Sequence, residues 1–165
     1  MLTATFLALL LIAPQGSSSA LPPGAVLIRD FFPPSSPYGS GHRGIDIAAE
    51  PGESVISWSD GTIAYAGTIA GKPVVTVRTS SDAGMGTATM RYTYEPAIAG
   101  LAMGTAVHAG QAIATVAARG GHCGGNGCLH VGLRTSAGYL DPRLGSGVAA
   151  HAVLRPWDAP AHTLP

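Results

Sequence analysis

The sequence predicts an all-β domain with almost no helix outside the first 20 residues, and three observations support this. Turn signals rich in Gly, Pro, Ser and Asp recur at roughly ten-residue intervals through the middle of the chain, a rhythm typical of short strands. The chain holds 23 Gly and 13 Pro while charged residues make up only 11%, which favours tight turns over surface helices. After the leader, no stretch repeats apolar side chains at helical spacing.

The 165 residues have room for one domain, because domains usually take about 100–200 residues. We expect residues 1–20 to be a signal peptide. Their apolar run from Phe6 to Ala13 is followed by small residues and is too short for the ~20 residues that span a bilayer. A buried first strand or helix is the alternative. Residues 21–40 are expected to form a proline-rich entry segment, residues 41–144 to form the β domain and residues 145–165 to form a flexible tail. No membrane span is expected in the mature chain.

The strands are placed by apolar and β-branched runs between turn signals. A short strand within residues 24–31 precedes the proline-rich loop. Further strands are expected at residues 44–47, 54–58, 61–67, 73–79, 88–94, 106–107, 112–117 and 129–134. Residues 51–67 and 103–120 both run as Gly, two residues, Val, a turn Gly and Ile-Ala, which favours two similar β-units facing each other across one core.

The charge balance and the cysteines limit the possible partners and the cellular compartment. Nine Lys and Arg balance nine Asp and Glu, so we expect no binding to nucleic acid or to an anionic membrane. Cys123 and Cys128 are separated by a glycine-rich linker. In an exported protein we expect such a pair to form a disulfide that holds the loop before His130, and a free Cys128 thiolate is the alternative.

Two imidazoles and one carboxylate form a candidate metal site. His42 and Asp46 lie four residues apart in HRGID, and His130 lies in the predicted strand CLHVGLR. Two histidines and a carboxylate can hold one Zn²⁺ while a fourth position stays open for water, as in hydrolytic zinc sites. A hydrogen-bonded surface pair of His42 and Asp46 is the alternative. Residues i and i+2 of a strand share a face, so Cys128 and His130 should point toward one groove.

Taken in order, GHRGIDIAAEPGESVISWSDGTIAYAG, MGTAVHAGQAIATV, CLHVGLR and YLDP resemble the lysostaphin-like zinc metallopeptidases, which cut cross-bridges or stem peptides of bacterial peptidoglycan. The resemblance covers residues 28–144. It implies compact, twisted antiparallel sheets in a barrel-sandwich hybrid fold, a duplicated hybrid motif with one zinc ion at the floor of a groove. It also implies that His42, Asp46 and His130 are the zinc ligands and that peptidoglycan is the partner.

The sequence departs from that family where two auxiliary histidines are expected, because Tyr94 and Cys128 stand at their positions. The histidines are implicated in activating the water and steadying the developing charge, and losing such a group typically costs ~10²–10⁴ in rate. Tyr94 keeps a hydroxyl that can donate a hydrogen bond, Cys128 can serve as a base only as a free thiol, and His122 is a candidate substitute. Arg43 is a candidate contact for a substrate carboxylate, with a solubilising groove-rim arginine as the alternative.

Three functions are compatible with these residues. The first is a secreted, cell-wall-associated, monomeric zinc endopeptidase of a divergent exported subgroup, acting on peptidoglycan peptide bonds by metal-activated water. The second is a non-catalytic wall-binding or enzyme-activating module of the same fold, in one form of which Cys128 closes the zinc site as a fourth ligand. The third is a carrier domain of the same fold class. The leader and the neighbours of Lys72, which match no attachment motif, disfavour it.

Overall fold

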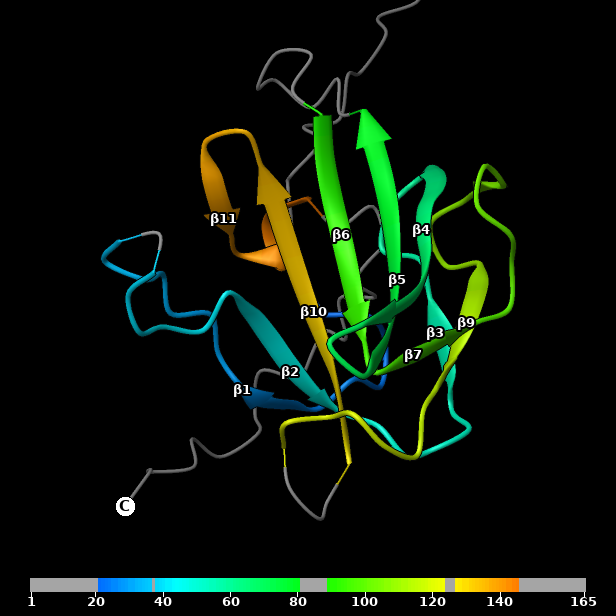
Figure 1. Cartoon of the computed structure of the whole chain (residues 1–165), viewed down its shortest axis with the longest axis horizontal. Helices are drawn as coiled ribbons and strands as arrows, with labels where there is room; N and C mark the ends of the chain where they lie inside the picture. The colour runs from blue at the N-terminus through cyan, green and yellow to red at the C-terminus, as the bar shows by residue number, and fades with distance from the viewer. Residues whose placement is uncertain (1–20, 37, 81–88, 124–126, 146–165) are drawn as a thin grey trace, which may run out of the picture.

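The structure is a computed structural model and describes residues 21–36, 38–80, 89–123 and 127–145. The predicted signal peptide and nearly all of the predicted tail lie outside these ranges. The described residues form antiparallel strands and one short 3-10 helix, Pro142–Gly145 (Figure 1). The strands are β1 (Leu27–Arg29), β2 (Gly44–Ala48), β3 (Ser54–Ile56), β4 (Gly61–Ile69), β5 (Lys72–Ser80), β6 (Thr89–Glu95), β7 (Ala97–Ala99), β8 (Ala106–Val107), β9 (Ala112–Val116), β10 (Cys128–Thr135) and β11 (Gly138–Leu140).

The all-β prediction is confirmed, and most predicted strands agree with the structure to within about two residues. The predicted strand at 54–58 ends early, at Ile56, because the chain bends at Trp58, whose N–H donates to the Tyr94 hydroxyl. Strands β7 and β11 were not predicted. Each has only three residues and is defined by its pairing with β9 or β10 rather than by a sequence pattern of its own.

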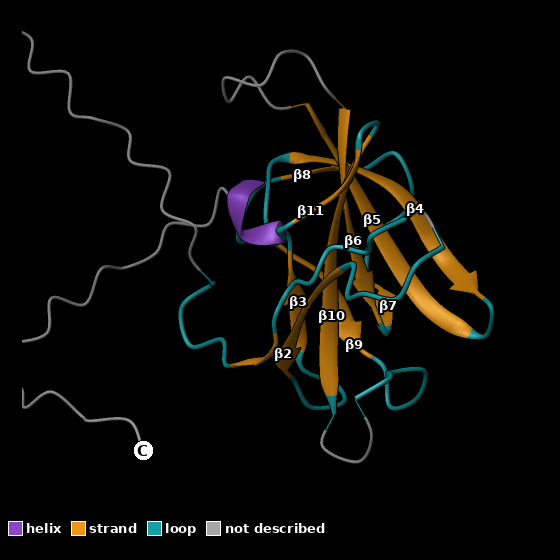
Figure 2. Ribbon diagram, turned by 90° about the vertical axis from the view of Figure 1, so that its left-hand side faces the viewer, coloured by secondary structure: helices purple, strands orange, loops and turns teal. Residues whose placement is uncertain are grey.

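Two sheets enclose one core. The larger sheet has the order β1-β2-β10-β6-β5-β4-β8, with β11 added beside β10, and the smaller has the order β3-β9-β7. Figure 2 shows the smaller sheet beside the long strands. Apolar side chains of both sheets meet in a single buried cluster that includes Trp58, Tyr92, Ile113 and Val131. No helix within the described ranges has the length and apolar character that crossing a membrane would require.

The two segments that echo each other in the sequence pair with each other in the structure. Strand β3 of the first segment pairs with β9 of the second, and β4 of the first pairs with β8 of the second. The exchange is reciprocal, since the first strand of each copy contacts the second strand of the other. The predicted half-repeat therefore corresponds to two units that share their strand pairings.

The side-chain alternation of β2, β10 and β6 places polar residues on the face of the sheet away from the core. Asp46, His130 and Glu95 stand at matched positions on these three strands. Their chain neighbours Ile45 and Val131 are fully buried in the core. Because successive side chains of a strand point to opposite faces, the candidate ligands Asp46 and His130 lie next to each other on the outer face.

Candidate metal centre

His42 is held in place by hydrogen bonds of its backbone and of one ring nitrogen. It lies just before β2, where its N–H donates to the Phe32 carbonyl at 2.7 Å and its own carbonyl accepts from Phe32 N. The ring atom Nδ1 lies 2.7 Å from the Asp30 carbonyl oxygen. A carbonyl can only accept, so Nδ1 carries the proton and Nε2 presents its lone pair to Asp46 and His130.

The Asp30 segment is itself anchored. The Arg143 guanidinium donates to the Asp30 carboxylate at 2.7 Å, and its Nε donates to the Asp141 carboxylate. Asp141 and Arg143 therefore link the end of the last strand to the segment that orients His42. Burial alone would raise the pKa of Asp141, but the hydrogen bonds from Arg143 hold this pKa below its ordinary value.

Close packing around Gly44 positions His130. A β-carbon added at Gly44 would lie 2.7 Å from His130 Nε2 and would also collide with the Val131 carbonyl. No residue other than glycine fits there without moving the ring or the strand, because β2 and β10 approach each other closely at this point. The pairing of Gly44 with Gly132 continues the β2–β10 register that sets His130 opposite Asp46.

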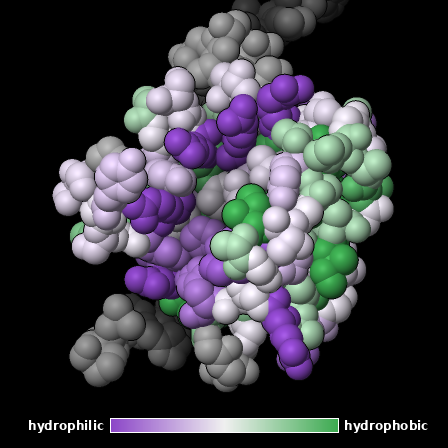
Figure 3. All heavy atoms as spheres, in the orientation of Figure 1, coloured by the Kyte–Doolittle hydropathy of each residue, from purple (hydrophilic) through white to green (hydrophobic). Residues whose placement is uncertain are grey.

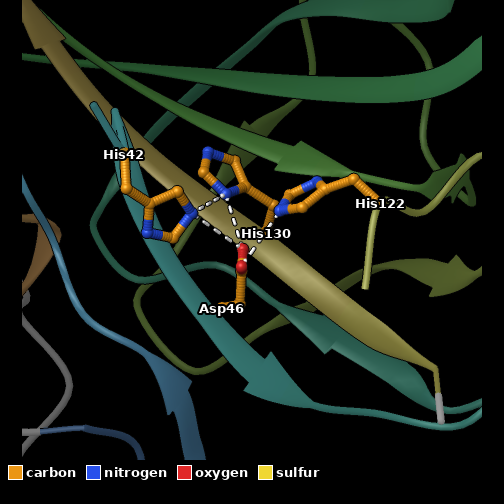
Figure 4. A group of neighbouring side chains, drawn as sticks. All are labelled: His42, Asp46, His122 and His130. Carbon is orange, nitrogen blue, oxygen red and sulfur yellow. Dashed lines mark hydrogen bonds and ion pairs between the residues drawn. The ribbon is translucent and has the colours of Figure 1, made fainter. Parts of the chain in front are cut away.

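Three ligand atoms converge on one point. His42 Nε2 lies 3.1 Å from Asp46 Oδ1 and 3.1 Å from His130 Nδ1, and His130 Nδ1 lies 2.8 Å from Asp46 Oδ1 (Figure 4). Zinc bonds of about 2.0–2.1 Å to His nitrogen place tetrahedral ligand atoms roughly 3.3 Å apart. The three separations are close to this edge length, so the residues fit one small divalent cation with a fourth position left over.

The surroundings of the Asp46 carboxylate favour its ionised form. Asp46 is only 1% exposed. Burial alone would raise its pKa, but hydrogen bonds from His130 and His122 and the nearby charge of His122 and His42 lower the pKa to about 2. A buried carboxylate surrounded by imidazoles is the donor set expected for a cation site.

His122 joins the cluster from the loop between β9 and β10. Its Nε2 lies 2.9 Å from Asp46 Oδ2, the carboxylate oxygen that His42 and His130 do not contact (Figure 4). The side chain is 32% exposed and is more open to solvent than the other three. The next residue, Cys123, forms a disulfide with Cys128 at the start of β10. The disulfide therefore fixes the loop residue beside His122 to the strand that carries His130.

The other two candidate catalytic residues offer no acid or base to this cluster, although the Cys128 sulfur lies within 4.8 Å of an Asp46 carboxylate oxygen. Tyr94 is fully buried on the core face of β6, and its hydroxyl accepts the Trp58 N–H at 2.8 Å. Burial raises the Tyr94 pKa, so the phenol stays neutral. Cys128 shares the outer face with His130, but its sulfur is bonded to Cys123 and offers no thiolate.

Arg43 lies beside the cluster at the edge of a cavity of about 300 Å³. Its guanidinium stands over the Tyr139 ring at 5.6 Å and donates to the Gly39 carbonyl at 3.1 Å. His130 and Glu95 line the same cavity. The carboxylate of Glu95 forms an ion pair with Lys72 at 3.6 Å. Arg43 thus borders a space that opens directly from His130.

Sequence reasoning missed two residues of this site. The Asp30 carbonyl orients His42, and Glu95 stands opposite His130. Every residue has a backbone carbonyl, so the identity of residue 30 does not reveal this contact. The position of Glu95 depends on the pairing of β6 with β10. The motif TYEP could have pointed to Glu95 only if its register against CLHVGLR had been known.

Comparison with known proteins agrees with the resemblance to lysostaphin-like metallopeptidases. Residues 40–142 match the sequence profile described as Peptidase family M23. An uncharacterized protein of Mycobacterium tuberculosis, Rv2891, is 34% identical over 147 residues, covering 87% of this chain and 55% of the relative. The chain therefore spans about half the length of the curated relatives it matches.

Two solved structures share the fold. The catalytic domain of the antimicrobial peptidase lysostaphin from Staphylococcus simulans matches with a TM-score of 0.56 at 20% identity, over 72% of this chain and 89% of that chain. A zinc-containing peptidase from Vibrio cholerae matches with a TM-score of 0.55 at 20% identity, over 72% of this chain and 36% of that one. At this identity the likeness concerns the fold, which is the one that the sequence predicted.

Proposed function

This chain belongs to peptidase family M23, and we propose that it is an exported zinc peptidase that hydrolyses peptide bonds of bacterial peptidoglycan. The observation that carries the proposal is the triangle of His42 Nε2, Asp46 Oδ1 and His130 Nδ1, whose edges measure 2.8–3.1 Å. Family membership supplies the metallopeptidase class. The peptidoglycan substrate is inferred from the resemblance to lysostaphin-like enzymes.

His42, Asp46 and His130 would hold the zinc ion, one through Nε2, one through a carboxylate oxygen and one through Nδ1. Zinc bound by three such groups supplies a Lewis acid that polarises a carbonyl and lowers the pKa of water. Asp30 fixes the His42 ring through Nδ1, and His122 holds the outer oxygen of Asp46. These contacts leave the ligand atoms preorganised before the cation arrives.

We assign the proton-handling role to His122 rather than to Tyr94 or Cys128. The imidazole hydrogen-bonds the Asp46 carboxylate and is partly open to the solvent from which a substrate would approach. The Cys128 sulfur also lies near Asp46, but it is bonded to Cys123 and cannot take up a proton. One of the ring nitrogens of His122 lies within 4.8 Å of a possible ligand atom of each of His42, Asp46 and His130. A general base must lie within hydrogen-bond reach of the proton it removes, directly or through one water molecule.

Substituting His122 with Ala tests this role. We expect the purified mature chain with zinc to release new amino termini from isolated cell walls, and His122→Ala to lower that rate by about 10²–10⁴ while zinc affinity changes little. His108→Ala is the matched control, since His108 is 86% exposed and lies away from the cluster. Absence of cleavage by the unmodified, zinc-loaded chain would argue against the peptidase proposal.

The same distances support a second function, a wall-binding or enzyme-activating module without turnover. His122 Nε2 is close enough to the other ligand atoms to act as a fourth ligand and fill the position that water needs. In that case His122→Ala should weaken zinc binding by tenfold or more, and the unmodified chain should bind walls without cutting them. Zinc affinity and cleavage, measured on the same two proteins, therefore separate the functions.

Export is supported by two independent features. The apolar run from Phe6 to Ala13 is typical of a signal peptide, and disulfides such as Cys123–Cys128 persist mainly in oxidising compartments outside the cytosol. We expect a secreted or wall-associated chain whose amino terminus begins near Leu21. Amino-terminal sequencing of the protein recovered from culture medium and from the wall fraction tests this. Recovery of the full-length chain from the cytosol alone would contradict it.

A further inference from the structure

Three arginines form a row across the outer face of the large sheet. Arg134 of β10 stands opposite Arg91 of β6, and Arg91 stands opposite Arg78 of β5. All three are exposed. Directly opposed residues of antiparallel strands have β-carbons about 4.5–5.5 Å apart, so the three side chains are immediate neighbours. In Figure 3 hydrophilic side chains follow one another over β10, β6 and β5 on this face.

The row is electrostatically costly for the free protein. Like charges at directly opposed positions of a sheet destabilise it. Within the described residues, the side chains of Arg78 and Arg91 form no hydrogen bond or ion pair. The guanidinium carbon of Arg134 lies 5.4 Å from the centre of the Tyr139 ring. Like charges that oppose folding and have no acidic partner among the described residues are explained if an anionic ligand neutralises them.

The row is continuous with the proposed zinc site. The Tyr139 ring contacts Arg134 and also Arg43, whose guanidinium lies 5.6 Å from the ring centre. Both arginines line the cavity of about 300 Å³ that also includes His130. His130 and Arg134 share one face of β10 and are four residues apart, roughly 13 Å at the rise of a β-strand. An extended peptide of about four residues would span that distance.

On the assumption that the proposed peptidase function holds, we propose that the arginine row of Arg78, Arg91 and Arg134, together with Arg43 and Tyr139, is a subsite for carboxylate groups of the substrate peptide. The substrate class is then an acidic stem peptide rather than an uncharged cross-bridge such as oligoglycine. Arginine suits this role because its planar guanidinium can bind a carboxylate through two hydrogen bonds.

The geometry favours a peptide over a long phosphodiester polymer. The row holds three side chains on adjacent strands and therefore extends only about 10 Å. The whole chain has equal numbers of basic and acidic residues, so it carries no general attraction for a polyanion. Arg134, at one end of the row, lines the cavity beside His130 together with Arg43, and the Glu95 carboxylate in that cavity is paired with Lys72.

Equilibrium binding tests the subsite without requiring hydrolysis. The probes are a fluorescently labelled tetrapeptide with two side-chain carboxylates and a free carboxyl terminus, its twin with all three converted to carboxamides, and pentaglycine. We expect the mature chain to bind the acidic peptide at least tenfold more tightly than the twin or pentaglycine. Raised salt should reduce that preference, because the contacts are between charges.

Variants locate the effect. Arg134→Gln and Arg91→Gln should each weaken binding of the acidic peptide about tenfold and leave binding of the twin unchanged. Arg119→Gln is the control because Arg119 is exposed and lies outside the row, in the loop after β9. Equal binding of acidic peptide and twin would overturn the proposal, as would a polyphosphate that binds while the acidic peptide does not. An inactive protein that still shows the acidic preference would count against the peptidase function alone.

Discussion

The candidate zinc ligands are oriented by contacts of single residues, and a sequence pattern does not give the geometry of these contacts. His42 is limited to one tautomer by the Asp30 carbonyl, and Asp46 offers one oxygen to two imidazoles and the other to His122. The sequence suggested His122 only because it is the nearest remaining imidazole. The structure gives this suggestion a physical basis, a 2.9 Å contact with the ligand carboxylate.

Gly44 gives a sharp test at this scale. Gly44→Ala places a methyl group against the Val131 carbonyl and 2.7 Å from His130 Nε2, so the His130 ring and the strand that carries it must shift. We expect zinc affinity, measured by competition with a chromogenic chelator, to fall at least tenfold. Gly100→Ala is the matched control, because an added β-carbon there meets its nearest atom at 3.5 Å, an ordinary contact. Equal affinities for the two variants would contradict the role given to Gly44.

Tyr94 is the second test, because the sequence made it a candidate catalytic group and the structure places its hydroxyl in the core. Tyr94→Phe removes the acceptor of a buried N–H and should lower the free energy of unfolding by about 1–3 kcal/mol, measured with urea. Zinc affinity and wall cleavage should stay within twofold of the unmodified chain at a temperature where both proteins are folded. A selective loss of cleavage with unchanged stability would restore Tyr94 as a catalytic candidate.

At the scale of elements, the site is assembled by two connections beyond the sheet. The disulfide between Cys123 and Cys128 ties the loop after β9 to the start of β10. The 3-10 helix after β11 carries Arg143, which joins Asp141 to Asp30 and so steadies the segment before His42. Each connection places a non-strand residue beside a strand residue of the cluster.

Removal of the disulfide tests the first connection. The variant with both Cys123→Ser and Cys128→Ser frees the loop that carries His122, and should lose about 2 kcal/mol of stability in the chain-entropy account of a short loop. We expect its wall cleavage to fall toward that of His122→Ala, while zinc affinity changes much less. A double variant that is less stable but fully active when folded would show that His122 needs no tether.

The ion pair of Arg143 with Asp141 predicts a pH dependence. The lowered pKa of Asp141 means that its stabilisation is fully present above the ordinary aspartate value of 3.8 and is lost as pH falls through the lowered folded-state value. We therefore expect Arg143→Gln to be less stable than the unmodified chain by up to about 1 kcal/mol at pH 6. The difference should shrink as the pH falls below 3.8. Urea unfolding of both proteins across this range measures it, and a difference that does not depend on pH would contradict the assignment.

At the scale of the whole molecule, one sheet serves two purposes. Its inner face packs with the small sheet into a core that contains Trp58, Tyr92 and Tyr94. Its outer face carries the candidate metal ligands Asp46 and His130 at one level and the row of Arg78, Arg91 and Arg134 at another. Stability and ligand recognition are thus separated by the alternation of side chains along β10 and β6.

Removal of the metal should affect the whole fold. A cation that binds the folded chain and not the unfolded chain stabilises it by about 2.7 kcal/mol at one hundred times its dissociation constant. We expect excess chelator to lower the melting temperature of the mature chain by several degrees, and added zinc to restore it. Asp46→Asn, which weakens the ligand set, is the control and should respond much less. A melting temperature unaffected by chelator would argue against a zinc site.

The sequence by itself determined the all-β class, most strands, the half-repeat and the candidate ligands His42, Asp46 and His130. These follow from local signals, since turn residues, alternating apolar residues and motif spacing act over a few positions. Tertiary structure alone decided that Tyr94 faces the core, that Glu95 stands beside His130 and that three arginines align. A shift of one residue in strand pairing would reverse each of these placements, and that register is set by packing across strands distant in sequence.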